Sequence, residues 1–211
     1  MQKLPPLLAI SYFSPIYFYK QLTNCPVVYI ENDENYLKQT YRNRCEIYAA
    51  NGKLSLSIPV QKLSNQKTNI RDIKISYEIN WQKQHLKSIE SAYSSSPFYE
   101  FYMDDFLDFF IKNTEFLFDL NLKIIETVNK ILNISPIIRF SDNFVFDTNN
   151  HFQDFRNLIS PKNESYNAST SINFDEYKQV FSEKYGFISN LSILDLIFNE
   201  GPNSISFLKI D

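Results

Sequence analysis

The chain has 211 residues, of which 44% are hydrophobic and 21% are charged, as is typical of a globular protein. The formal net charge of −3 argues against binding of duplex DNA or RNA, which depends on a basic surplus, so we expect no nucleic-acid partner. Only three glycines occur, and they stand too far apart for a P-loop or a dinucleotide-binding fingerprint. No apolar run approaches the roughly 20 residues of a membrane-spanning helix, so we expect no transmembrane segment.

The N-terminus and the cysteines favour a cytoplasmic protein. Pro5 and Pro6 interrupt the short apolar run at the N-terminus, which therefore does not have the pattern of a secretory signal peptide. The two cysteines, Cys25 and Cys45, form neither a disulfide framework nor a metal-ligand pair, which is typical of a reducing compartment. We expect a single domain over residues 1–211, with no cofactor and no metal site.

The first part of the chain predicts a β-α-β unit. Residues 7–12 are a continuous apolar run of strand length, and Ser14 and Pro15 then occupy the N-cap and first-turn positions of a helix. Residues 27–30 are apolar on both faces, which favours a second strand that is buried on both sides. The helix is expected to turn three residues inward: Ile16, Tyr19 and Leu22.

Residues 45–60 alternate between apolar and polar positions, as a β-hairpin does. Asn51 and Gly52 are predicted at the turn, because both tolerate positive φ angles. The expected apolar face carries Cys45, Ile47, Ala49, Leu54, Leu56, Ile58 and Val60. If the first strand begins at Arg42, then Arg42, Arg44 and Glu46 point away from this face, toward either solvent or a cleft.

From residue 81 onward the apolar period becomes helical, with Asn80 as a candidate N-cap. The apolar stripe of this helix carries Trp81, His85, Ile89 and Ala92. The Ser-Ser-Ser-Pro run at residues 94–97 ends it. Further helices are predicted over residues 98–111, 114–132, 175–186 and 192–198, with Asn121 on the apolar stripe of the second of these.

These patterns predict an α/β fold class. Residues 1–78 form the α/β sheet portion, in which the β-α-β unit and the β-hairpin build a mixed sheet. Residues 79–211 form a mainly helical portion. Within it, residues 142–173 are rich in Asn, Ser and Thr and predict a long irregular excursion, which in a compact domain is usually functional or mobile.

Many residues along the chain recur at spacings that resemble a known family. They are Tyr36, Lys38, Asn43, Arg44, Ile58, Pro59, Val60, Trp81, Lys83, His85, Tyr93, Pro97 and Phe98. Together with the opening strand and the helix that starts at Pro15, they resemble the WbqC-like family of bacteria. The resemblance covers about residues 7–134 and continues more loosely over residues 190–202.

The resemblance implies a role in cell-surface polysaccharide or lipopolysaccharide O-antigen synthesis. It suggests a transferase that moves a group to a sugar or amino sugar from an anionic activated donor, such as a nucleotide sugar or an acyl or aminoacyl donor. One departure is clear, because Ser11, Tyr12 and Phe13 stand where a common form of the family has a His-Gln-Pro motif.

Two residues are candidates for proton transfer. His85 is the leading general base, because imidazole titrates near neutral pH and the chain has only two histidines. Its apolar neighbours fit equally well with a hydrogen-bonded core histidine. Glu31 ends a predicted strand, where ligands of open α/β sheets gather, but the neighbouring Asp33 and Glu34 favour an ordinary acidic loop to the same degree.

The segment before the hairpin predicts an anion site. Guanidinium forks such as those of Arg42 and Arg44 bind phosphate or carboxylate in a bidentate manner, although charges ahead of a strand are also commonly solvated. Asn43 and Asn121 offer amides that either bind sugar hydroxyls or satisfy buried backbone groups. With the residues that the resemblance adds, the substrate-binding candidates are Tyr36, Lys38, Arg42, Asn43, Arg44 and Trp81.

Two non-catalytic functions stay open. The missing His-Gln-Pro motif and the lack of a catalytic triad favour a module that binds a nucleotide sugar without turnover. The aromatic helices between residues 98 and 118 favour a protein-interaction module of the envelope glycan machinery.

Overall fold

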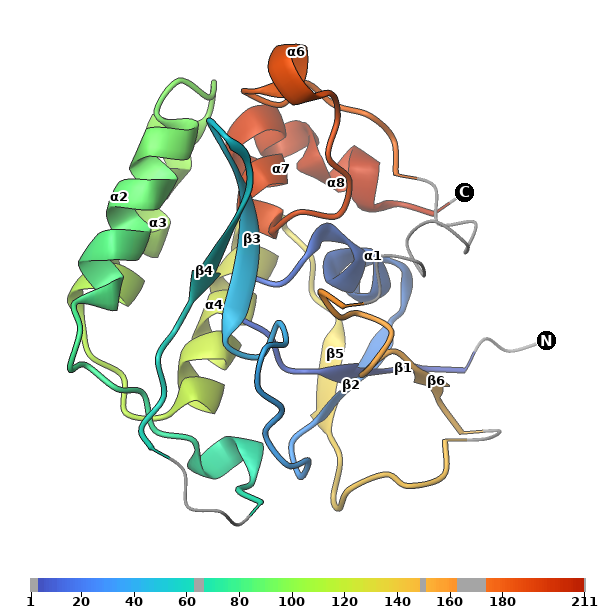
Figure 1. Cartoon of the computed structure of the whole chain (residues 1–211). Helices are drawn as coiled ribbons and strands as arrows, with labels where there is room; N and C mark the ends of the chain where they lie inside the picture. Colours follow the sequence, from blue (N-terminus) through green and yellow to red (C-terminus); the bar gives the residue numbers. More distant parts are fainter. Residues whose placement is uncertain (1–3, 63–66, 149–150, 163–173, 211) are drawn as a thin grey trace.

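The chain opens with the predicted β-α-β unit, which the computed structural model confirms. The structure describes residues 4–62, 67–148, 151–162 and 174–210. β1 (Pro6–Ala9) and β2 (Val27–Glu31) are parallel neighbours, and α1 (Ile16–Asn24) connects them (Figure 1). The predicted inward face of α1 is confirmed, since its members are at most 2% exposed: Ile16, Tyr19 and Leu22.

The start of α1 differs from the prediction in one detail. Pro15 occupies the N-cap position and makes no side-chain cap hydrogen bond. The hydroxyl of Ser14, expected to cap the helix, lies 2.5 Å from the hydroxyl of Ser11. Both serines are buried, so this hydrogen bond satisfies two hydroxyl groups that would destabilise the fold if they had no partner.

Two strands from later in the chain complete a four-stranded parallel sheet with the order β5-β2-β1-β6 (Figure 1). β5 (Ile137–Phe140) pairs with β2, and β6 (Gln153–Asp154) pairs with β1. The sequence patterns predict neither strand, because β5 is a largely exposed edge and β6 is only two residues long within the excursion predicted to be irregular. The carboxyl ends of all four strands therefore meet at one edge of the sheet.

The predicted hairpin forms a two-stranded sheet of its own, built from β3 (Arg44–Ala49) and β4 (Gly52–Ser57), and does not join the β-α-β unit in the mixed sheet that was predicted. Its register pairs Ala49 with Gly52, so Ala50 and Asn51 form the loop, one position earlier than predicted. Gly52 has a φ of +95°, whereas Asn51 keeps a negative φ, so only one of the two predicted turn residues uses the left-handed region. Because β3 begins at Arg44, Arg42 lies outside the hairpin.

The second half of the chain is mainly helical, as predicted, and the α/β class is confirmed. The helices are α2 (Trp81–Tyr93), α3 (Tyr99–Ile111), α4 (Leu117–Ile131), α6 (Ser182–Tyr185), α7 (Ile193–Glu200) and α8 (Ser204–Leu208), with 3-10 turns at Ile70–Asp72 and Gly201–Asn203. The predicted cap of α2 is confirmed, since the side chain of Asn80 accepts a hydrogen bond from the amide of Lys83 at 3.1 Å.

The prediction of a helix over residues 175–186 is wrong, because only α6 (Ser182–Tyr185) is helical in this segment. Tyr177 and Gln179 both donate hydrogen bonds to the carboxylate of Asp195 on α7, at 2.6 and 2.8 Å. Tyr93 of α2 donates to the same fully buried carboxylate at 2.9 Å. Residues two apart, such as Tyr177 and Gln179, point to the same side of an extended chain but to different sides of a helix. Their shared bonding to Asp195 therefore holds the segment extended against α7.

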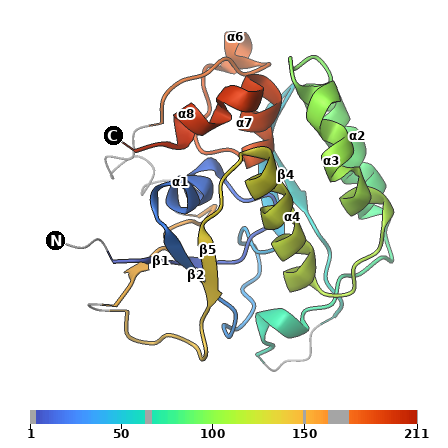
Figure 2. The same ribbon diagram turned by 180° about the vertical axis from the view of Figure 1, so that it is seen from behind.

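The elements enclose one hydrophobic core cluster that draws on the parallel sheet, the hairpin and the helices. α2 and α3 lie side by side on one flank, where α2 also packs on β3 (Figure 1). α1 packs against β2 on one side and against α7 and α8 on the other (Figure 2). The loops at the carboxyl edge of the parallel sheet run along the lower face of the molecule (Figure 1).

Candidate functional site

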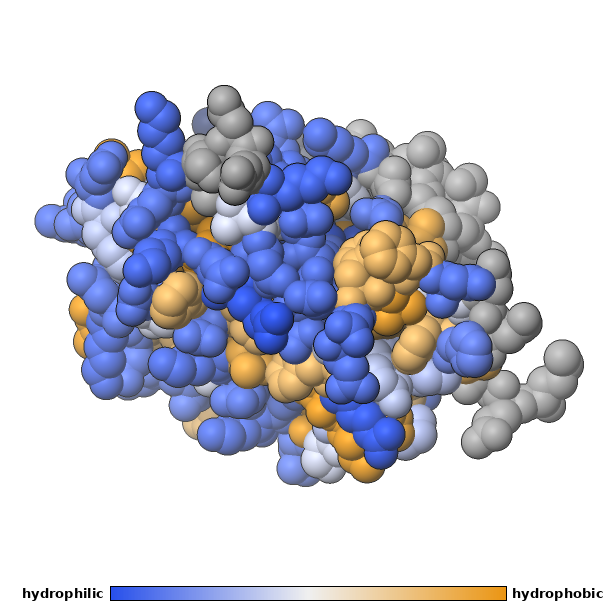
Figure 3. All heavy atoms as spheres, turned by 90° about the horizontal axis from the view of Figure 1, so that it is seen from below, coloured by the Kyte–Doolittle hydropathy of each residue, from blue (hydrophilic) through white to orange (hydrophobic). Residues whose placement is uncertain are grey.

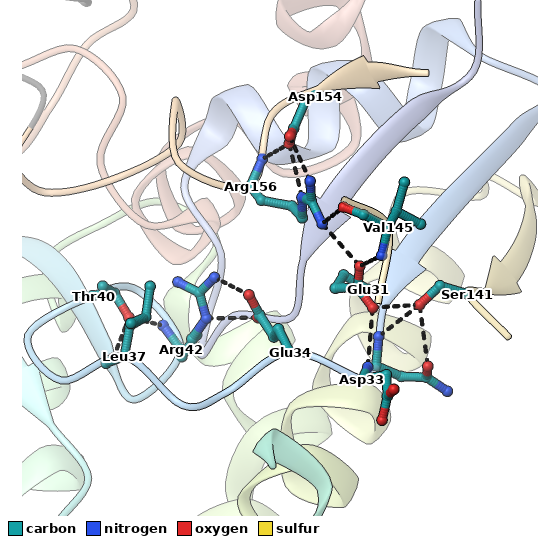
Figure 4. Close-up of polar contacts among 11 residues, drawn as sticks. Glu31, Asp33, Glu34, Leu37, Thr40, Arg42, Ser141, Val145, Asp154 and Arg156 are labelled. Atoms are coloured by element: carbon teal, nitrogen blue, oxygen red, sulfur yellow. Dashed lines mark hydrogen bonds and ion pairs between the residues drawn. The ribbon is translucent and has the colours of Figure 1, made fainter. Parts of the chain in front are cut away.

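Glu31, the last residue of β2, has its side chain fully buried at the carboxyl edge of the parallel sheet (Figure 4). Its Oε1 accepts hydrogen bonds from the Ser141 hydroxyl at 2.5 Å and from the Asp33 amide at 3.0 Å. Its Oε2 accepts from the Val145 amide at 3.0 Å and from Nη1 of Arg156 at 2.9 Å. These four bonds fill the lone-pair positions of the carboxylate and tie the segments after β5 and β6 to the end of β2.

Arg156, which follows β6, is held on three sides. Its Nε and Nη2 donate to both carboxylate oxygens of Asp154, at 3.0 and 2.7 Å, and its Nη1 also donates to the carbonyl of Val145 at 2.9 Å. The ring of Phe144 lies over the guanidinium, with its centroid 5.0 Å away. Burial acts to raise the pKa of Asp154, but the bonds and charge of Arg156 outweigh it and lower the pKa.

Glu34 and Arg42 form a second buried ion pair beside the first (Figure 4). Nε of Arg42 donates to Oε1 of Glu34 at 2.6 Å, and Nη2 donates to Oε2. Arg42, predicted to bind an anion, is only 3% exposed and thus faces Glu34 rather than solvent. The amide of Asn121 on α4 donates to the carbonyl of Arg42 at 2.7 Å, so this candidate satisfies a buried backbone group.

Four of the predicted site residues meet at the entrance of the hairpin. Tyr36, Lys38, Asn43 and Arg44 line one open depression of about 330 Å³, together with the end of β4 and the residues that follow it, which we call the cationic depression. Nε of Arg44 donates to the hydroxyl of Ser57 at 3.3 Å. Within the described ranges of the chain, no carboxylate lies within 4.0 Å of the charged groups of Lys38 or Arg44, so both cations are available to a ligand.

A second depression, of about 300 Å³, shares Tyr36 with the cationic depression. Its lining is Glu34, Asn35, Tyr36, Leu37, Lys67, Phe144, Arg156 and Asn157, and we call it the Glu34 depression. Burial raises the pKa of Tyr36 to about 12, although the nearby charges of Arg42 and Arg44 act to lower it. Tyr36 is therefore a neutral phenol that lines both depressions. The lower face of the molecule is largely hydrophilic (Figure 3).

A model of the WbqC-like protein family matches residues 11–173, which is well over half of the chain. The chain belongs to the WbqC-like protein family. No curated protein matches it, and no solved structure does. The match covers both depressions and the two buried ion pairs, so the site described above lies within the part of the chain that defines this WbqC-like protein.

Ser11, which stands where a common form of the WbqC-like family has a histidine, follows β1 at the same edge of the sheet. It lines a small cavity of about 10 Å³ together with Arg42 and Arg156. That volume holds about one water molecule. Among the helices that the structure describes, none combines the length and the apolar character needed to cross a bilayer.

His85 and Trp81 are both on α2 and lie in the core, where α2 packs against the hairpin. They are 4% and 1% exposed, and neither lines the two depressions. Nδ1 of His85 lies 3.0 Å from the hydroxyl of Tyr12. Burial lowers the pKa of His85 to about 4, although a hydrogen bond with the backbone of Ser57 acts to raise it, so the imidazole is neutral at physiological pH.

The lowered pKa of His85 predicts a loss of stability in acid. The folded state disfavours the imidazolium, whereas the unfolded state protonates His85 at its ordinary pKa of 6.5. The contribution of the neutral imidazole to the free energy of unfolding is therefore fully present above pH 6.5 and is lost as the pH falls toward 4. The loss is about 3 kcal/mol for a shift of this size. Urea unfolding of wild type and His85→Gln at several pH values should show a steeper acid decline in wild type. Equal slopes would mean that His85 is protonated to the same extent when folded and unfolded.

The sequence patterns did not single out Arg156, Asp154 or Ser141. Asp154 and Arg156 lie in the excursion predicted to be irregular, and Ser141 follows an unpredicted edge strand. Their function as partners of Glu31 depends on the parallel pairing of β5 and β6, which carry no periodic signal. The one available hint was the alternation of acidic and basic residues at positions 154 and 156, which is common in exposed loops as well.

Proposed function

We propose that this WbqC-like protein is a bacterial group transferase of cell-surface polysaccharide or O-antigen synthesis. It binds an anionic activated donor, such as a nucleotide sugar or an acyl or aminoacyl donor, in the cationic depression. The acceptor, a sugar or amino sugar, occupies the adjoining Glu34 depression. The observation that carries this proposal is a pair of cations that have no carboxylate partner among the described residues, Lys38 and Arg44, beside a second hollow that shares Tyr36 with the first.

The two cations have complementary properties as anion ligands. The guanidinium of Arg44 offers a planar fork that matches two oxygens of a phosphate or carboxylate, while the Lys38 ammonium adds a compact charge on a flexible stem. Asn43 is fixed at the wall of the depression, because its amide donates to the carbonyl of Ile58 at 2.8 Å. Gln39, on the rim, holds a left-handed φ of +60°, the kind of local strain that often accompanies ligand sites.

The environments of Glu31 and His85, the two candidates for proton transfer in the sequence analysis, favour a second, non-catalytic function. All lone-pair positions of Glu31 are filled by protein donors, and His85 is buried away from both depressions. A non-catalytic module that binds a nucleotide sugar would have this arrangement. It predicts ligand binding without release of the leaving group, whereas a transferase releases it.

The Arg44→Ala variant tests the anion site. A donor at about 100 times its dissociation constant stabilises wild type by roughly 2.7 kcal/mol, which raises the melting temperature by roughly 5–10 °C. Removal of a charge-assisted hydrogen-bond pair should weaken binding by about 3 kcal/mol and abolish this shift. The measurement is a thermal-shift panel of nucleotide sugars, acyl and aminoacyl phosphates and inorganic pyrophosphate.

Arg139→Ala is the matched control, since Arg139 is an exposed arginine on β5 that does not line either depression. It should keep the full shift. A shift that survives in Arg44→Ala would place the anion elsewhere, and no shift of wild type with any member of the panel would refute the donor site.

A further inference from the structure

We propose that Glu34 is the proton acceptor of the transfer and takes the proton from a hydroxyl or amine bound in the Glu34 depression. This inference rests on the proposed transferase function and names the group that performs its proton transfer. Glu34 is not one of the residues that the sequence patterns favoured for this role. Its case depends on three features of the structure: access to a hollow, unused lone pairs and a fixed orientation.

Access to the hollow separates Glu34 from the other buried carboxylate on the sheet edge. Glu34 lines the Glu34 depression, although its side chain is only 6% exposed. Glu31 is fully buried and does not line either depression. A proton acceptor must lie within hydrogen-bond reach of the proton that it removes, and of these two residues only Glu34 borders a hollow that can hold an acceptor.

Unused lone pairs on the carboxylate also distinguish Glu34 from Glu31. In the part of the chain that the structure describes, its carboxylate accepts hydrogen bonds from a single residue, Arg42, one at each oxygen. A carboxylate offers about four acceptor positions, so one at each oxygen stays open. The four positions of Glu31 are already occupied.

Arg42 fixes the orientation of Glu34. The bidentate pair holds the plane of the carboxylate, and Asn121 in turn donates to the backbone carbonyl of Arg42. Burial raises the pKa of Glu34, and the hydrogen bonds and charge of Arg42 act to lower it, with a net rise; Glu31 and Arg156 have smaller effects of opposite sign. A carboxylate that is more basic than an ordinary glutamate suits a general base.

The step balances as a nucleophilic displacement. The acceptor oxygen or nitrogen forms a bond to the transferred carbon of the donor, and the bond from that carbon to the phosphate leaving group breaks. The electron pair leaves with the phosphate, which Arg44 and Lys38 stabilise in the adjoining cationic depression. The acceptor proton moves to Glu34, whose Arg42 partner remains charged throughout.

Water can replace the acceptor, so slow donor hydrolysis provides an assay that needs no known acceptor. The probes are UDP-glucose, UDP-N-acetylglucosamine and dTDP-glucose, with release of the nucleotide measured for wild type, Glu34→Gln, Glu34→Asp and Glu46→Gln. Glu46 is the matched control, because it is 8% exposed and paired with Lys53 at 3.2 Å but does not line the Glu34 depression. Donor affinity is measured in parallel by thermal shift.

We expect Glu34→Gln to lose roughly 100-fold or more in turnover with donor affinity unchanged, Glu34→Asp to recover part of it, and Glu46→Gln to match wild type. Turnover of Glu34→Gln within threefold of wild type overturns the inference and leaves the donor site intact. If Glu34→Gln does not fold, the pH profile of wild type decides: the rate should fall in acid with a midpoint above 4.5, the ordinary glutamate value, and a rate that stays flat through pH 4.5 overturns the inference. Wild type that binds no donor overturns the transferase and the inference together.

Discussion

Arg156→Ala is expected to lower the free energy of unfolding by about 3–5 kcal/mol, the cost of breaking a buried ion pair from one side. The substitution leaves Glu31 fully buried with one donor fewer and removes the partner that Asp154 holds through two bonds. It also frees the carbonyl of Val145. Urea unfolding followed by circular dichroism measures the change.

The surface variant Arg139→Ala is the control for this effect, and it should change stability by less than about 0.5 kcal/mol. Arg156→Lys should recover only part of the loss, because an ammonium cannot make the two parallel bonds to Asp154. If Arg156→Ala were as stable as wild type, the bonds of Glu31 to the segments after β5 and β6 would contribute little to the fold.

Trp81→Ala is expected to cost about 3–5 kcal/mol, as large-to-small changes of buried aromatic residues do. Trp81 is 1% exposed, and its ring lies edge-on to Tyr12 and His85, with centroids 6.5 and 5.1 Å away. Removal of the indole would leave a cavity between α2 and the residues that follow β1. The same unfolding experiment measures this loss.

Trp81→Phe separates the packing of this residue from the substrate-binding role that the sequence suggests for it. Phenylalanine refills most of the volume, so the variant should be more stable than Trp81→Ala and should keep the thermal shift given by the donor. Loss of the donor shift in a folded Trp81→Phe protein would instead favour direct contact between Trp81 and the substrate.

The parts of the fold that carry a period could be predicted from the sequence. The alternating hairpin and the stripe of α2 each repeat with a spacing that one kind of element alone satisfies, and the strand before α1 was predicted from the length of its continuous apolar run. β5 and β6 carry no such signal, because β5 is largely exposed and β6 has only two residues. Their pairing depends on tertiary contacts such as the bond from Arg156 to Glu31, which no local pattern contains.

Part of the lining of the cationic depression could also be predicted from the sequence. Tyr36, Lys38, Asn43 and Arg44 are close in sequence and do line one depression, since a short loop brings them to the entrance of the hairpin. The environment of each side chain was not predictable: Arg42 lies in the same run as Arg44 but turns inward to Glu34. Whether a charged residue faces a ligand or a buried partner is decided by the second element that packs on it, here the loop after β2.

Binding of an anionic donor in the cationic depression is tested most directly by a crystal structure of the protein with the nucleotide sugar that gives the largest thermal shift. The expected result places phosphate oxygens within hydrogen-bond distance of the Arg44 guanidinium and the Lys38 ammonium, with the transferred group beside Tyr36 and directed toward Glu34. A donor bound at another surface, with this depression empty at saturating concentration, would contradict the proposed function.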